Sequence, residues 1–232
     1  MKCGPMSINP RCAKCGLALC GSTPMDEHSP EDLPDFCPMK TSSKIVERSV
    51  ERYREEEIRD IYVPATIAEG EAYESVRGTT MAVRPRVKEL IEFAKLTGSG
   101  KIGIAFCAGL RDEAGRLTKI LEGQGFEVSS VMCKCGGIDK ELLGVENEYK
   151  IGDPGKFEAA CNPVLQAELL NEAGVDINVI VGLCLGHDMV FTRESKAPVT
   201  TLVVKDRLTG HNPVIALYSA YHRGTIESQA RK

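Results

Sequence analysis

From residue 101 onwards, short apolar runs alternate with segments whose apolar residues recur at helical spacing. Strands that alternate with helices are typical of a parallel sheet covered by helices, because parallel neighbours need a long crossover connection. The sequence therefore predicts an α/β domain over 99–232 with a mostly parallel, doubly wound, Rossmann-like sheet. The expected strands are 101–106, 126–132, 176–183 and 199–204, with a last strand at 214–218 joined to the fourth by a hairpin.

Five cysteines lie where this sheet would bring them together. Four of them follow the ends of the first three strands, and the fifth precedes Asn162-Pro163, a pair typical of a helix start. The carboxyl ends of parallel strands and the N-termini of the following helices share one edge of the sheet, where ligands bind. We therefore expect one thiol-rich cofactor site, called the rim below, formed by Cys107, Cys133, Cys135, Cys161 and Cys184.

Three residues of the rim are candidate catalytic groups. Cys161 would lie at the positive end of a helix, which favours its thiolate. His187 could ligate a metal, relay a proton or hydrogen-bond a cluster sulfide, or it could be a capping or buried histidine. Asp188 is either a helix cap or a catalytic base. Because five thiols exceed the four that one cluster or ion needs, one of them could react beside an open coordination position.

Two polar segments follow the strand expected at 199–204. Lys205-Asp206-Arg207 could reach the rim, although an ordinary charged turn is the simpler interpretation. His211-Asn212-Pro213 has the composition of a turn, and lining the site is its less favoured alternative.

Residues 1–40, called the cap below, are rich in cysteine and contain six prolines, so long helices or strands are not expected there. The spacing Cys12-x2-Cys15-x4-Cys20, completed by Cys37-Pro38, supplies four thiolates that can surround one zinc ion or one 4Fe–4S cluster. The first pair resembles a zinc knuckle, whereas the uneven spacing and the final Cys-Pro are closer to iron–sulfur ligation. Metal binding would then order the segment. Cys3 lies nearby.

Residues 41–98 are expected to form a helical segment that packs on the α/β body. Helices are predicted over 42–62, more weakly over 64–76, and from Pro85 to the glycines that begin at Gly98.

The composition excludes several classes of protein. The net charge of −4 lacks the basic excess of a nucleic-acid-binding protein, and no apolar run approaches the ~18 residues that cross a bilayer. Ten cysteines in 232 residues are too few for a disulfide scaffold, so free thiols in a reducing compartment are expected. We therefore expect a cytoplasmic protein that binds neither nucleic acid nor membrane.

Several motifs of the chain carry a family resemblance. They are Cys12-x2-Cys15-x4-Cys20, Cys37-Pro38, Cys133-x-Cys135, Cys161-Asn-Pro, Gly182-Leu-Cys-Leu-Gly-His-Asp188, and the stretch from Ala197 through Lys205-Asp-Arg to Gly210-His-Asn-Pro213. Together they resemble the domain-of-unknown-function 1847 family, predicted metal-binding, cysteine-rich proteins of anaerobic bacteria and archaea. The resemblance covers nearly the whole chain and implies metal binding, but no particular reaction. Cys3 is additional to the family pattern.

These features predict a protein with two cysteine-ligated centres, one in the cap and one at the rim. We expect iron–sulfur clusters of the 4Fe–4S type, with zinc as the alternative in the cap. The expected activity is redox or desulfurising chemistry on a small molecule, with that substrate or an electron-transfer protein as partner. The alternative is a zinc- or metal-binding sensor, carrier or metallochaperone without enzymatic activity. A deep pocket beside the rim would favour the enzyme, and a closed, fully ligated site would favour the alternative.

Overall fold

The computed structural model describes residues 8–22, 24, 27, 29 and 31–229, so Cys3 lies outside the described residues. The chain divides into two compact units, residues 1–66 and 67–232. The division between them falls within helix α3 (Glu56–Gly70).

The first unit consists of short elements. It contains the 3-10 turns η1 (Cys12–Lys14) and η2 (Leu19–Gly21), the helices α1 (Pro38–Thr41) and α2 (Ser43–Arg52), and the start of α3. The single helix expected over 42–62 is wrong, because residues 53–55 form a turn between α2 and α3. Arg54 and Glu55 donate their backbone N–H groups to carbonyls three residues back in this turn. Neither glycine nor proline marks the break, so helical spacing alone does not reveal it.

In the second unit, a β-hairpin follows α3 and takes the place of the end of the helix expected over 64–76. Strand β1 (Tyr73–Val76) pairs antiparallel with β2 (Thr79–Ala82). Arg77 and Gly78 join the strands, with φ angles of 53° and 81°, and two consecutive positive φ angles are typical of tight hairpin turns. The expected helix is therefore wrong beyond Gly70, where α3 ends.

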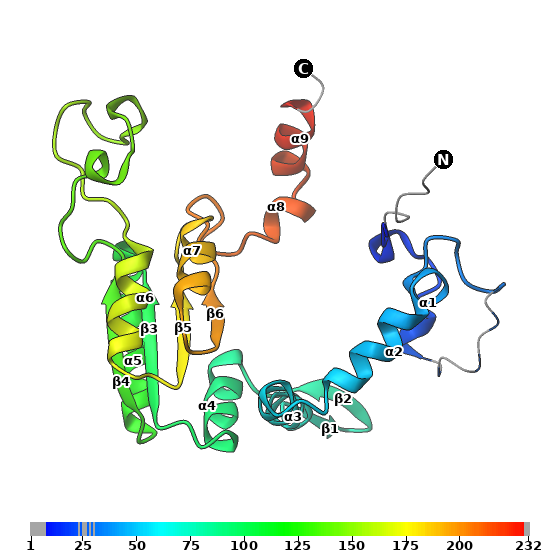
Figure 1. The fold of residues 1–232 in the computed structure, drawn as a ribbon. Helices are drawn as coiled ribbons and strands as arrows, with labels where there is room; N and C mark the ends of the chain where they lie inside the picture. The colour runs from blue at the N-terminus through cyan, green and yellow to red at the C-terminus, as the bar shows by residue number, and fades with distance from the viewer. Residues whose placement is uncertain (1–7, 23, 25–26, 28, 30, 230–232) are drawn as a thin grey trace, which may run out of the picture. The chain divides into compact units, whose positions relative to one another are not determined.

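The α/β architecture is confirmed. Four strands form one sheet in the order β4-β3-β5-β6, and all neighbours are parallel. Figure 1 shows these strands side by side, with their arrowheads at one edge of the sheet. The strand order reverses at β3, because β4 lies on one side of it and β5 on the other. The strands are β3 (Lys101–Phe106), β4 (Glu127–Met132), β5 (Ile177–Val181) and β6 (Val199–Val203).

The central strands β3 and β5 form the core of this unit, and Ile102 and Ile104 are fully buried between the covering helices. Gly103 lies opposite Asn178 in the sheet, and a Cβ at Gly103 would come within 2.0 Å of Asn178 Oδ1, so only glycine fits there. The helices are α4 (Arg86–Leu96), α5 (Arg111–Gly123), α6 (Pro163–Glu172) and α7 (His187–Glu194). Across the described ranges, no helix is both long enough and apolar enough to span a membrane.

The strand expected at 214–218 is wrong, and with it the edge hairpin. These residues form helix α8 (Ile215–Tyr218), which is followed by α9 (Ala220–Gln229). Pro213 begins the turn, because its carbonyl accepts the N–H of Ala216 at 3.1 Å. Leu217 and Tyr218 are 68% and 80% exposed, so this apolar run is not buried in a sheet.

Candidate functional site

The rim thiols lie at the edge where the parallel strands end. The backbone N–H of Cys107 donates to Val181 O at 3.1 Å, and that of Cys133 donates to Phe106 O at 2.8 Å. Both cysteines therefore extend the hydrogen-bond ladder of the sheet by one residue. Cys107 follows β3, which is where the strand order reverses, and a crevice for ligands is expected outside the carboxyl ends of strands at such a position.

A long connection between β4 and α6 brings Cys161 back to Cys133. This connection, residues 134–160, is called the excursion below, and it contains the 3-10 turns η5 (Lys140–Leu143) and η6 (Asn147–Tyr149) (Figure 1). Asn162 N donates to Cys133 O at 2.7 Å, and Ala160 N donates to Ile138 O at 2.8 Å. These bonds close the base of the excursion and hold its two flanking cysteines next to each other.

A buried lysine ties the excursion together. The side chain of Lys150 is 1% exposed, and its Nζ lies 3.1 Å from Asp139 Oδ1 and 2.5 Å from Glu141 Oε1. Its Nζ also donates to Lys156 O at 2.8 Å. A buried ammonium needs such partners, because desolvation is costly for an unpaired charge. Sequence reasoning missed this lysine, since its partners are up to eleven residues away and no motif marks them.

Cys133 interacts with two other rim thiols. The sulfurs of Cys133 and Cys161 lie 3.8 Å apart, and Cys133 also hydrogen-bonds the Cys107 side chain. Ala108 donates its backbone N–H to Cys133 Sγ at 3.4 Å. Cys133 is therefore the central thiol, joined to a strand end on one side and to a helix start on the other.

These contacts separate the acidities of the thiols. The hydrogen bond to Cys133, together with burial, raises the pKa of Cys107 to about 12. The pKa of Cys161 is instead lowered to about 7, chiefly because the Cys133 thiol can donate to the Cys161 thiolate, with help from the charge of Lys134. The expected helix start is present, since Asn162 Oδ1 accepts the N–H of Leu165 at 3.0 Å. The neighbouring thiol is nevertheless the main cause of the low pKa.

Cys184 lies beside this group and is held by a cation. Arg207 Nη2 donates to Cys184 Sγ at 2.9 Å. The charge of Cys184 acts to raise the pKa of Cys161, so the two thiols are within electrostatic range. Cys135 is half-buried in the turn after β4, and its N–H donates to Met132 O at 3.0 Å. The interactions found among the described residues do not join Cys135 to the other rim thiols.

The two other candidate catalytic residues lie at the start of α7. Nδ1 of His187 is buried and has no hydrogen-bond partner among the described residues. Asp188 Oδ1 accepts the N–H groups of Gly186 at 2.9 Å and Met189 at 2.8 Å, as a helix cap does. His187 thus has an unused ring nitrogen near Cys184, whereas one oxygen of Asp188 is already occupied.

Cations follow the strand β6 at the same edge. The Lys205 side chain crosses toward β3, with Nζ 3.3 Å from the position of a Cβ on Gly109, and its charge acts to lower the pKa of Cys107. Arg207 contacts Cys184, as described above. Asp206, between the two cations, accepts the N–H groups of Leu208 and Thr209. The Thr209 side chain, followed by these backbone bonds, holds the pKa of this carboxyl low. The segment 205–207 therefore reaches the rim and is more than a charged turn.

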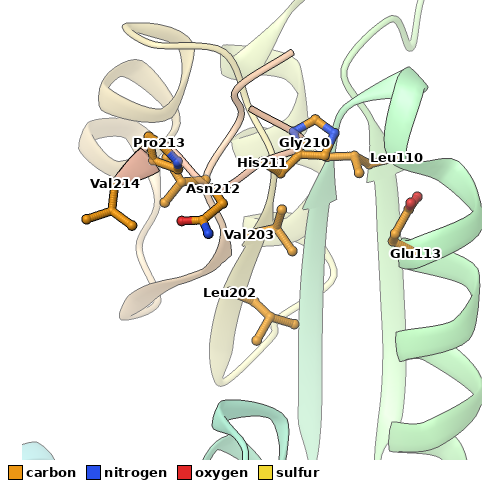
Figure 2. A pocket seen from close by; sticks show the side chains of 10 residues that line it. Leu110, Glu113, Leu202, Val203, Gly210, His211, Asn212, Pro213 and Val214 are labelled. Carbon is orange, nitrogen blue, oxygen red and sulfur yellow. The ribbon is translucent and has the colours of Figure 1, made fainter. Parts of the chain in front are cut away.

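An open pocket of about 620 Å³ lies at the end of β6, and its lining includes Val204, the residue before Lys205 (Figure 2). Leu110 and Glu113 form one side, and the end of β6 with the turn 210–214 forms the other. Its wall is largely aliphatic, with the polar side chains of Glu113, His211 and Asn212. The segment His211-Asn212-Pro213, expected as a turn, thus also lines a cavity.

The cap cysteines are arranged differently. Cys12 and Cys20 are exposed on 3-10 turns, Cys15 is half-buried, and Cys37 is buried at the N-cap of α1. Nowhere in the described parts of the chain do three or more His, Cys, Asp or Glu side chains surround a point that could hold a metal ion. The two metal centres therefore stay predictions, and the thiol contacts at the rim are the structural feature closest to one.

Comparisons with known proteins give one family and one relative. The family model described as "Protein of unknown function (DUF1847)" matches residues 37–202, a stretch that includes all five rim cysteines. The chain is also similar to Uncharacterized protein MJ0455 of Methanocaldococcus jannaschii, with 43% identity over 212 residues. The alignment covers 91% of this chain and 95% of that protein. No solved structure gives a significant match.

Proposed function

The chain belongs to the DUF1847 family of proteins of unknown function, as its cysteine motifs predict, and we propose that it binds a metal centre at the rim. In this proposal the centre is an iron–sulfur cluster that serves redox or sulfur chemistry on a small molecule in the cytoplasm. A second centre in the cap, held by Cys12, Cys15, Cys20 and Cys37, belongs to the same proposal. The sheet is taken as doubly wound and Rossmann-like, since its strand order reverses at β3.

The observation that carries the proposal is the contact of Cys133 with both Cys107 and Cys161. These thiols come from three separate segments of the chain and meet at one edge. Thiolates are soft ligands that suit zinc and iron–sulfur clusters. Cys184 is the best fourth donor, because it lies within electrostatic range of Cys161. The orphaned Nδ1 of His187 adds an unused polar atom to the same edge.

The sulfur spacing also supports a second candidate, a single zinc ion in a carrier or sensor. Four sulfurs at about 2.3 Å from one tetrahedral ion are about 3.8 Å apart. The Cys133–Cys161 distance of 3.8 Å already has this value. A cubane cluster would require these thiols to spread to roughly 6–7 Å. Arg207 can keep its hydrogen bond to Cys184 in either centre, because a ligating thiolate still accepts hydrogen bonds.

Cationic side chains near the rim can stabilise the negative charge of thiolate ligands. An iron–sulfur cluster, when bound, supplies one-electron transfer or an iron that can take up sulfur. Four thiolates carry a large negative charge, and the charges of Lys134, Lys205 and Arg207 can compensate for it. Cys161 gives up its proton most readily of the contacting thiols, since its pKa is about 7.

Anaerobic purification followed by iron, zinc and acid-labile sulfide analysis tests the proposal. We expect iron and sulfide in the wild-type protein, and Cys133→Ser should remove the share that belongs to one centre. Cys135→Ser is the matched control, because Cys135 is not joined to the contacting thiols, and it should leave the metal content unchanged. Zinc without sulfide would establish the second candidate. Absence of bound metal in both the wild type and the variants would contradict the proposal.

A further inference from the structure

The pocket beside the rim shares a wall with the thiol site. Gly182 follows β5 and has φ of +70°, and a Cβ there would lie 1.9 Å from Leu110 Cδ1 and 3.6 Å from Lys205 Cδ. The side chains of Leu110 and Lys205 therefore both lie close to Gly182. Leu110 lines the pocket, whereas the charge of Lys205 acts to lower the pKa of Cys107. Lys205 thus lies next to a residue of the pocket wall and within electrostatic range of a rim thiol.

The turn after β6 fixes a hydrogen-bond donor at the pocket. His211 has a left-handed φ of +67°, and its N–H donates to Asp206 O at 2.8 Å. Its Nδ1 accepts the N–H of Asp206 at 3.2 Å, so the neutral ring carries its proton on Nε2. A non-glycine residue held in this region is strained, and such strain is concentrated at functional sites. Figure 2 shows the His211 ring beside Leu110 at the pocket.

The charges at the pocket select among ligands. Within the described parts of the chain, no carboxylate lies within ion-pair distance of Lys205, and Oδ1 of Asp206 already accepts two backbone N–H groups. No carboxylate of the described residues therefore competes with an outside anion for Lys205, although its charge also acts on Cys107. Glu113 lies on the pocket wall and would repel a second negative charge. Asn212 adds one more polar side chain, and Leu202, Val203 and Val214 form an aliphatic surface along β6 and the turn.

We propose that this pocket binds the substrate of the rim and that the substrate is a monocarboxylate with an apolar body. The carboxylate is bound by Lys205 Nζ and His211 Nε2–H, and the body packs on the aliphatic wall. The pocket volume of about 620 Å³ lies within the range of ~300–1,000 Å³ that is usual for small-molecule sites. The assignment as substrate rests on the proposed function, whereas carboxylate binding is measurable without it.

Hexanoate is a suitable probe, with hexan-1-ol as its uncharged counterpart. We expect hexanoate to shift the backbone NMR signals of Leu110, Val203 and His211 saturably at millimolar concentration, and to bind at least tenfold more tightly than hexan-1-ol. Lys205→Met and His211→Ala should each weaken hexanoate binding about tenfold. Lys205→Arg keeps the charge and should retain binding, and Lys196→Met, a matched charge change at an exposed position, should have no effect.

Equal binding of hexanoate and hexan-1-ol would overturn the proposal, as would wild-type affinity in Lys205→Met. The latter result would mean that Lys205 serves only to compensate the thiolates. The titration is repeated on Cys133→Ser, whose metal content is measured separately. Hexanoate binding by a wild-type protein that lacks metal would support the pocket and contradict the metal centre, and metal in the wild type without hexanoate binding would do the reverse. Loss of metal with retained hexanoate binding in Cys133→Ser is the result that both proposals expect.

Discussion

The rim cysteines lie on strand ends and at a helix start, whereas the cap cysteines that the structure describes lie on 3-10 turns and at the start of a one-turn helix. Cys107 and Cys133 are buried against the central strands, whose side chains form the core. In the described part of the first unit, Cys37 is the one buried residue. Core burial therefore places the rim thiols before any ligand binds, but it provides little to place the cap thiols.

This difference shows two ways in which a chain can organise cysteines. At the rim, apolar burial and sheet hydrogen bonds determine where the thiols lie, so metal binding would add to a structure that is already stable. In the cap, the free energy of metal binding would itself order the segment, as in small metal-binding domains. The two regions should consequently respond differently to loss of cysteine or of metal.

The largest effect is expected in the cap. Replacing Cys12 and Cys15 with Ser should make residues 1–40 sensitive to protease while the α/β unit stays resistant, because the cap has little buried core to replace the lost ligands. Limited proteolysis read by mass spectrometry, together with metal analysis, measures this. Cys133→Ser is the control and should leave cap cleavage unchanged. Full metal content and unchanged protease resistance in the double variant would show that the cap is not a metal site.

The rim should depend instead on close packing. In Gly182→Ala, the new methyl group would lie 1.9 Å from Leu110 Cδ1 at a φ of +70°. We expect a loss of about 2–5 kcal/mol in the free energy of unfolding from overpacking and left-handed strain together. Gly144→Ala is the control, because Gly144 is left-handed with φ of +83° and nothing lies within 4 Å of its Cβ position, so only about 1–2 kcal/mol is expected. Urea unfolding compares them, and equal losses would remove packing against Leu110 as a cause.

A smaller, local effect is expected from the excursion. Lys150→Met leaves Asp139 and Glu141 without their buried cation and should loosen the loop that holds Cys161 beside Cys133. Hydrogen exchange at the amides of Lys140 and Ala160 should speed up by on the order of tenfold. Lys156→Met is the control, since the exposed Lys156 pairs only with Asp153 at the surface. Similar exchange in both variants would show that the lysine does not hold the excursion.

The sequence predicts the sheet well and its surroundings less well. β3 and β5 are buried on both faces, so their residues form continuous apolar runs that are visible without a structure. The run at 214–218 has the same appearance, but its side chains are exposed in a helix, and burial is not encoded in the run itself. The hairpin around Arg77-Gly78 lacks the Asn-Gly signal of such turns.

The candidate site shows the same limit. The position of Cys161 follows from Asn162-Pro163, because a capping residue and an N1 proline act locally. Its closeness to Cys133 depends on the bonds that close a 27-residue excursion and on the buried Lys150, which no local pattern contains. The pocket wall at Leu110 depends on Gly182, more than seventy residues away in the chain.

The smallest effect concerns the pH dependence of the metal-free protein. The pKa of Cys161 is lowered from 9.0 to about 7 in the folded state, so its thiolate stabilises the fold fully above pH 9, and this contribution is lost as the pH falls through 7. The pKa of Cys107 is raised to about 12, so its burial opposes folding as the pH rises above 9. We therefore expect the free energy of unfolding to increase between pH 7 and 9 and to decrease above pH 9.

Cys133→Ala removes the thiol that donates to the Cys161 thiolate, so it should slow iodoacetamide labelling of Cys161 at pH 7, as read by peptide mass spectrometry. Unchanged labelling would show that Cys133 does not set this pKa.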